Sequence, residues 1–267
     1  MSPQASCPPL ADFSETAVTV QGLTIGWGDV TLVEDITFSV GRGEIFAILG
    51  GSGSGKSTLL RYLVGLERPV KGEIDVAGRG PPDLDRGLPP FGVMFQGGAL
   101  FGSMTVLENV TLPLEEWTKL PLADVDVIGG AKLRLVGLGG AASKLPAEIS
   151  GGMTKRAAIA RALALDPPIV FFDEPGAGLD PLTTLELDDL IVTLARSTHL
   201  TVLMVTHELE SVYRVADRCL LLDKDSKRVL AIGDPRVLRE SDDPRIYDFF
   251  NPLSKEKERT WRLPPTT

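Results

Sequence analysis

Short apolar runs separated by glycine, proline or charged residues dominate the hydrophobic pattern of the chain. Near the start these runs predict strands over Val18–Ile25, Thr31–Val40 and Glu44–Leu49. The third strand leads directly into a glycine-rich loop, after which Lys56–Leu66 has the spacing of a helix. A strand, a glycine-rich loop and a helix in this order form the setting in which such a loop binds phosphate.

The pattern becomes helical in the middle of the chain and then returns to strands. Residues 72–95 hold short strands and a Pro/Gly-rich turn, and apolar residues recur every three or four positions from about 105 to 165. Buried strands are predicted over Pro168–Phe172 and Thr201–Val205, with a helix over about Thr183–Arg196 between them. The sequence therefore predicts an α/β core with an inserted helical subdomain at about residues 97–165.

The core is predicted to span residues 17–240, preceded by a loose polar arm at residues 1–16. It closes with a helix from His207 and with strands over Cys219–Leu222 and Val229–Ile232.

A C-terminal extension follows at residues 241–267. It carries Ile246, Phe249 and Phe250 at helical spacing, and then Trp261. Such residues either dock on a second subunit or fold back on their own domain, and the sequence leaves both alternatives open.

Composition narrows the class of protein. The chain has 267 residues with 43% hydrophobic and 24% charged residues, which is typical of a globular protein. A net charge of −9 argues against a nucleic-acid partner, because such proteins present a basic face. Cys7 and Cys219 are expected to be free thiols in a reducing compartment. With neither a secretory signal nor a long apolar run, a cytoplasmic chain is expected, whose link to a membrane comes through a partner.

The glycine-rich loop matches the pattern G-x-x-x-x-G-K-[ST]. Its backbone N–H groups would surround phosphate, Lys56 would reach the β and γ phosphates, and the Ser57 hydroxyl would ligate Mg²⁺. A plain glycine turn is the alternative, and the flanking strand and helix argue against it. The expected nucleotide-binding residues are Gly50, Gly51, Ser52, Gly53, Ser54, Gly55, Lys56, Ser57 and Thr58.

Further candidates lie where buried strands end. Asp173 and Glu174 follow an apolar strand, at the edge where α/β sheets bind ligands. Asp173 would hold Mg²⁺, and Glu174 would polarise the water that attacks the γ-phosphate. His207 would clamp the γ-phosphate, and the amide of Gln96 would reach Mg²⁺ or the attacking water. Taken singly, each has a plain structural alternative, such as a solvated carboxylate or a surface histidine.

A second anion site is predicted at Ser150-Gly151-Gly152-Met153, where a serine and two glycines open a helix. A chain with two phosphate sites either binds two ligands or uses the second site to complete the first one on another copy.

Together these motifs resemble the ATP-binding subunit of an ABC transporter over about residues 18–240. In the family's terms they are Walker A (Gly50–Ser57), the Q-loop (Gln96), the signature (Ser150-Gly151-Gly152), Walker B with its glutamate (Asp173-Glu174), the D-loop (Gly178-Leu179-Asp180) and the H-switch (His207).

The resemblance implies a P-loop NTPase (RecA-like) core with an antiparallel β subdomain and an inserted helical subdomain. It further implies ATP and Mg²⁺ as ligands, with Lys56, Glu174 and His207 as catalytic residues and Ser57, Gln96 and Asp173 at the metal. Two copies would close head-to-tail around two ATP molecules, so that Ser150–Met153 of one copy contacts the γ-phosphate held by Lys56 of the other.

Trp27 matches the position where the family places an aromatic ring on adenine, usually tyrosine. A tryptophan stacks equally well on a base, although a half-buried strand aromatic is the alternative.

Within the family, the run Phe95–Phe101 and the signature residue Met153 resemble the Mce-type phospholipid transporters, which include the maintenance-of-lipid-asymmetry system. The segments Val106–Leu114, Ala157–Ala162 and Asp243–Ile246 agree with that subfamily. The resemblance implies an integral-membrane permease, an Mce-domain lipid-binding protein and a small accessory subunit as partners, with this subunit at the cytoplasmic face of the inner membrane. The alternatives are another ABC transporter and a non-transport ATPase that acts as a regulatory switch.

Overall fold

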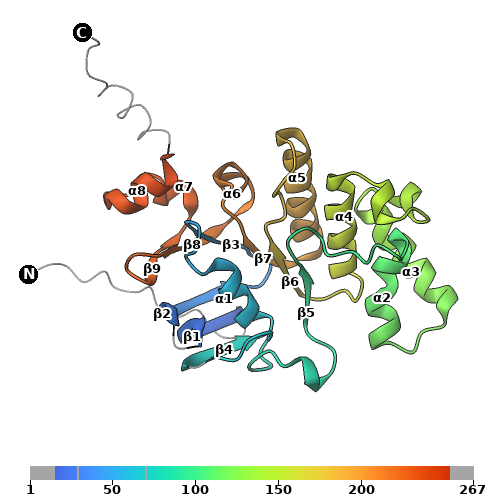
Figure 1. Ribbon diagram of the computed structural model, residues 1–267, viewed down its shortest axis with the longest axis horizontal. Coiled ribbons are helices and arrows are strands. Elements are labelled where there is room, and N and C mark those ends of the chain that lie inside the picture. Colours follow the sequence, from blue (N-terminus) through green and yellow to red (C-terminus); the bar gives the residue numbers. More distant parts are fainter. Residues whose placement is uncertain (1–15, 29, 70, 253–267) are drawn as a thin grey trace, which may run out of the picture.

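The computed structural model describes residues 16–28, 30–69 and 71–252, and Figure 1 shows how their elements are arranged. A six-stranded sheet forms the centre, with the strand order β5-β6-β7-β3-β8-β9. Its first five strands run parallel, and β9 pairs antiparallel with β8. The bounds are β3 Ile45–Gly50, β5 Phe91–Met94, β6 Ile169–Asp173, β7 Thr201–Val205, β8 Arg218–Asp223 and β9 Arg228–Gly233.

Both faces of the central sheet are covered by apolar side chains. Along β3, Ile45, Ala47 and Leu49 enter one hydrophobic cluster, whereas Phe46 and Ile48 enter the other. This alternation follows from the pleat, which points successive side chains to opposite faces. It explains why the buried strands appear in the sequence as continuous apolar runs.

A second, three-stranded antiparallel sheet has the order β2-β1-β4 and packs on one of these clusters. Its strands are β1 Thr16–Trp27, β2 Val30–Gly41 and β4 Lys71–Val76. β1 therefore begins two residues before the predicted strand Val18–Ile25 and ends two residues after it. The sheet confirms the expected antiparallel β subdomain, drawn in blue and cyan at the lower left of Figure 1.

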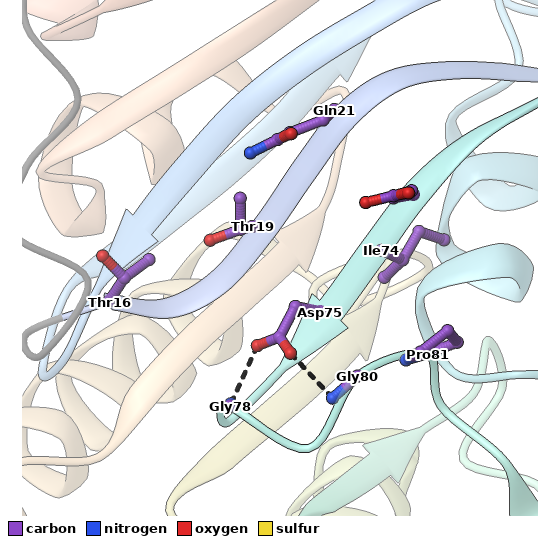
Figure 2. A pocket seen from close by; sticks show the side chains of 9 residues that line it. Thr16, Thr19, Gln21, Ile74, Asp75, Gly78, Gly80 and Pro81 are labelled. Carbon is purple, nitrogen blue, oxygen red and sulfur yellow. Dashed lines mark hydrogen bonds between the residues drawn. The ribbon is translucent and has the colours of Figure 1, made fainter.

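The outer face of this sheet carries a pocket of about 590 Å³. Figure 2 shows Thr19 of β1 beside Asp75 of β4, whose carboxylate accepts hydrogen bonds from the N–H groups of Gly78 (2.8 Å) and Gly80 (2.7 Å). The residues that line the pocket belong to none of the sequence motifs. We therefore build the candidate site from the motif residues and not from this hollow.

The inserted helices lie beyond the β5 edge of the central sheet (Figure 1). They are α2 Val106–Trp117, α3 Leu122–Leu135 and α4 Gly151–Ala162, all within the predicted helical region. A capping box between Thr105 and Glu108 starts α2 and satisfies two N–H groups at its end.

Two helices of the core begin at residues other than those predicted. α5 (Pro181–Thr198) starts two residues early, because the Asp180 carboxylate accepts from the N–H groups of Leu182 and Thr183 at 3.1 Å. α6 (Leu209–Val215) starts two residues after His207, since Glu208 still has an extended backbone. His207 consequently lies on a connecting segment rather than in a helix. The remaining core helix is α1, Lys56–Leu63.

The described part of the C-terminal extension folds back on its own domain. After α7 (Pro235–Leu238), α8 (Pro244–Phe250) buries Ile246 and Phe250 in the core cluster. The hydroxyl of Tyr213 donates to the carbonyl oxygen of Phe250 at 2.8 Å. Trp261 lies outside the described residues, as do Cys7 and most of the N-terminal arm.

Burial raises the pKa of the Cys219 thiol to about 12, so this cysteine is an unreactive core residue. Across the described ranges, no helix combines the length and hydropathy that crossing a membrane requires.

The buried carboxylate of Asp188 lowers the stability of the folded protein. Asp188 of α5 is 4% exposed, and its Oδ2 atom has no hydrogen-bond partner within the described part of the chain. Burial raises its pKa from 3.8 to about 6, which the Ser211 hydroxyl and the Arg214 guanidinium oppose. Because the folded-state pKa exceeds the unfolded one, the group's contribution to stability is present at low pH and is lost as pH rises to about 6.

We therefore expect Asp188→Asn to be more stable than the wild type at pH 8 by about 2–3 kcal/mol, and nearly equal to it at pH 4. Urea denaturation at both pH values measures this difference. Asp189→Asn is the control, because Asp189 is exposed and its ion pair with Arg214 is worth under about 1 kcal/mol. An Asp188→Asn variant less stable than wild type at pH 8 would contradict the expectation.

Candidate functional site

The glycine-rich loop runs from the end of β3 into α1. Gly50 has a φ of +153°, and a Cβ on it would lie 2.4 Å from the Ser54 hydroxyl oxygen, so the tight turn requires glycine there. Gly55, with a φ of +96°, is the N-cap, and no described side chain caps α1. N–H groups at the start of this helix are therefore available to an anion.

Lys56 is the first residue of α1, directly after this loop. Its ammonium donates to the carbonyl oxygens of Gly50 (2.9 Å) and Gly51 (3.2 Å). Burial lowers the pKa of Lys56, and the nearby carboxylates of Glu174 and Asp173 oppose that effect. A partly desolvated ammonium beside open N–H groups fits the phosphate chain of a nucleotide.

The hydroxyl of Ser57 donates to the Asp173 carboxylate at 3.3 Å. Burial raises the pKa of Asp173, and this hydrogen bond opposes the rise. Two oxygen ligands from the protein fit Mg²⁺, which prefers oxygen and is usually held by few carboxylates together with substrate phosphates. Gln96 lies two residues after β5, at the same edge of the sheet as Asp173 at the end of β6, and the side chain of Gln96 is exposed.

Glu174 and His207 are in direct contact. The Nδ1 atom of His207 lies 2.9 and 3.0 Å from the two carboxylate oxygens of Glu174. The contact forms because β6 and β7 are parallel neighbours whose carboxyl ends meet. Glu174 has a φ of +50°, a left-handed conformation that is unusual for a residue with a side chain.

The signature segment opens α4 as predicted. Ser150 is the N-cap, and its hydroxyl oxygen accepts from the Met153 N–H at 3.3 Å. Ser150 and Gly151 are exposed, whereas Gly152 is buried, and a Cβ there would lie 2.5 Å from the methyl group of Thr183. Met153 packs partly on the core, so its side chain has a structural role as well.

Trp27 and Asp180 lie at the margins of this arrangement. The Trp27 ring, at the end of β1, is 47% exposed, and the Arg61 guanidinium lies 5.4 Å from its centre. An exposed ring on this strand end is accessible to a base. Asp180 caps α5, which gives it a structural role within its own chain.

Two basic residues of α4 contact the motifs and were not identified from the sequence. Lys155 donates to the carbonyl oxygen of Glu174 at 3.1 Å. Arg161 donates to the carbonyl oxygens of Gly98 (2.7 Å) and Ala99 (2.8 Å), next to Gln96. α4 also carries other charged residues, so neither the residue type nor the spacing distinguishes these two positions as part of a site.

Comparisons with known proteins identify the family of this chain. A family model described as ABC transporter matches residues 33–177. The chain is 42% identical over 240 residues to a probable ribonucleotide transport ATP-binding protein, mkl, of Mycobacterium leprae, which covers 88% of this chain and 69% of that protein. It spans 66% of the same protein from other mycobacteria.

It is also 38% identical over 242 residues to the intermembrane phospholipid transport system ATP-binding protein MlaF of Escherichia coli K12, covering 89% of each chain. Among solved structures it is similar to the dimeric ATP-binding cassette MJ0796 bound to ADP and phosphate. The TM-score is 0.72 and the identity 29%, over 81% of this chain and 98% of that one.

Proposed function

Because this chain belongs to the ABC transporter family and is an ATP-hydrolysing cassette, we propose that it energises phospholipid transport between the inner and outer membranes of a bacterium. The observation that carries the proposal is the similarity to MlaF, which extends over 89% of both chains. The run Phe95–Phe101 and the signature residue Met153 favour the same subfamily. Transport of another solute is the alternative, since the mycobacterial relatives are named for ribonucleotides.

In this proposal the loop Gly50–Thr58 and Lys56 bind the phosphates of ATP, and Trp27 stacks on its adenine. Ser57, Gln96 and Asp173 hold Mg²⁺, whose positive charge would offset the charge that develops on the phosphate oxygens. The short distance between the Ser57 and Asp173 oxygens supports this assignment.

Glu174 is the general base. Its carboxylate accepts a proton from the attacking water, the water oxygen bonds to the γ-phosphorus, and the bond from that phosphorus to the leaving ADP oxygen breaks. His207 orients the carboxylate through its Nδ1 atom, and its exposed ring leaves Nε2 able to contact the γ-phosphate.

Two copies of the chain would complete each other's sites. Ser150–Met153 of one copy would contact the γ-phosphate bound by Lys56 of the other, and Asp180 would lie at the same interface. The exposure of Ser150 and Gly151, at the positive end of α4, supports this arrangement. The dimeric state of the MJ0796 cassette supports it independently.

The membrane partner would dock at the junction of the α/β core and the inserted helical subdomain. Phe101 is 53% exposed, and its backbone is fixed by Asn109, which accepts from its N–H (2.7 Å) and donates to its carbonyl oxygen (3.1 Å). An exposed ring on a fixed backbone suits a contact with an integral-membrane permease. An Mce-domain lipid-binding protein and a small accessory subunit would complete the complex, with this chain at the cytoplasmic face of the inner membrane.

Copurification tests this proposal. From detergent-solubilised membranes of the native host, the tagged chain should recover a permease, an Mce-domain protein and bound phospholipid, identified by mass spectrometry. Phe101→Ser should reduce that recovery without changing the ATPase rate of the isolated subunit. Leu122→Ser is the matched control, because Leu122 is a similarly exposed apolar residue on α3. Recovery of a permease with neither an Mce-domain protein nor phospholipid would reject the lipid assignment.

A further inference from the structure

Lys155 is a buried lysine on the helix that carries the signature segment. It is 5% exposed, and lysine is almost never fully buried unless it is paired. Burial lowers the pKa of Lys155, and the surrounding carboxylates of Glu174, Asp173 and Glu208 oppose that effect. A buried ammonium next to the Walker B carboxylates is a group that the mechanism above does not use.

The hydrogen bond of Lys155 goes to the backbone of Glu174 and not to its carboxylate. The Glu174 carbonyl oxygen accepts from the Lys155 ammonium at 3.1 Å and from the Ala177 N–H at 3.2 Å. The Glu174 N–H donates to the Val205 carbonyl oxygen at 2.9 Å. These contacts fix a residue whose left-handed backbone is unfavourable for a side chain. The backbone in turn sets the direction of the carboxylate.

Ser150, the N-cap of the same helix, lies five residues before Lys155. Five helical residues span about 7.5 Å along the axis, so the two positions move together. Arg161, further along the helix, holds the carbonyl oxygens of Gly98 and Ala99 beside Gln96. The single helix α4 thus carries the signature segment at its start, and that segment would face a second subunit. Through Lys155 and Arg161, α4 also contacts the Walker B and Q-loop segments of its own subunit.

We propose that Lys155 is a positioning residue that couples the signature end of α4 to Glu174 of the same chain. Contact of Ser150 with the nucleotide of the second subunit would then set the geometry of this subunit's own general base. The inference rests on the shared sites proposed above, and it makes hydrolysis at the two sites cooperative.

Lys155→Met tests the coupling, because it removes the donor and keeps the length of the side chain. In the full-length dimer we expect kcat to fall roughly 10–100-fold, as for a misplaced catalytic group, with KM within about twofold. The Hill coefficient for ATP should fall to about 1, the value for independent sites. Lys155→Arg should restore both, since it keeps the charge and the donor.

Lys132→Met is the matched control, because Lys132 pairs with Asp166 on the helical lobe, away from the motifs. A Lys155→Met variant with wild-type kcat and Hill coefficient would overturn the proposal. So would a loss of kcat that Lys155→Arg does not rescue and that follows a lowered Tm.

A second measurement separates positioning from assembly. In the Glu174→Gln background, Lys155→Met should still form the ATP-dependent dimer, since ATP binding does not need the base in place. Failure of that dimer would also overturn the proposal. Lipid transport takes no part in these assays. A wild-type enzyme with a Hill coefficient near 1 would overturn the coupling, whereas the shared sites themselves are tested separately by dimers of two different chains.

Discussion

Glu174→Gln is expected to reduce ATP hydrolysis by about 10²–10⁴-fold while ATP stays bound, which is the range for removal of a general base. Glutamine has the shape of glutamate but cannot take the proton of the attacking water. The groups proposed to bind phosphate, Lys56 and the loop around it, are unchanged. ATP should therefore still draw two copies together, and without hydrolysis the closed dimer should accumulate.

Phosphate release, equilibrium nucleotide binding and light scattering after gel filtration measure these three properties. Glu210→Gln is the matched control, because Glu210 is an exposed glutamate in the first turn of α6. Wild-type phosphate release by Glu174→Gln would show that Glu174 is not the base. Loss of hydrolysis together with loss of ATP binding would instead mean that Glu174 is needed to bind ATP before the reaction.

The contact between Glu174 and His207 shows which part of the site follows from sequence. The residues are 33 positions apart, but each follows an apolar run of strand length. Once those runs are neighbouring parallel strands, their carboxyl ends meet at one edge, and the glycine-rich loop after β3 joins them there. The hydrophobic pattern and the glycine spacing therefore predict the core, the nucleotide-binding loop and the position of the site carboxylates at the strand ends.

What the sequence did not predict depends on tertiary contacts. Lys155 and Arg161 are ordinary residues for a helix surface. Only the packing of α4 buries Lys155 and half-buries Arg161 beside backbone carbonyl oxygens. The start of α6 after His207 depends on the extended backbone of Glu208, for which no nearby residue type gives a signal. The burial of Ile246 and Phe250 likewise depends on the cluster that α8 meets, since helical spacing alone does not identify the partner surface.

The shared site makes a second large prediction, which concerns dimers of two different chains. Lys56→Ala removes the phosphate-binding ammonium, and Ser150→Asp places a negative charge where the γ-phosphate of the other subunit would lie. Aspartate is itself a good N-cap, so this change should leave α4 folded. Each variant alone should lose hydrolysis as a homodimer, because each disables both composite sites.

Mixed dimers, purified through different tags on the two chains, then distinguish shared from separate sites. With Lys56→Ala on one chain and Ser150→Asp on the other, both defects fall in the same composite site, and about half of the wild-type rate should remain if the sites turn over independently. Cooperative sites, as the Lys155 coupling requires, would leave less than half. With both changes on one chain and a wild-type partner, each site carries one defect, and hydrolysis should be lost. Ser150→Asn in place of Ser150→Asp keeps the cap without the charge and should preserve more activity.

A higher rate in the second arrangement would mean that Ser150 acts within its own chain. A higher rate in the first arrangement requires that each ATP be hydrolysed between two copies, which makes dimerisation a step of catalysis.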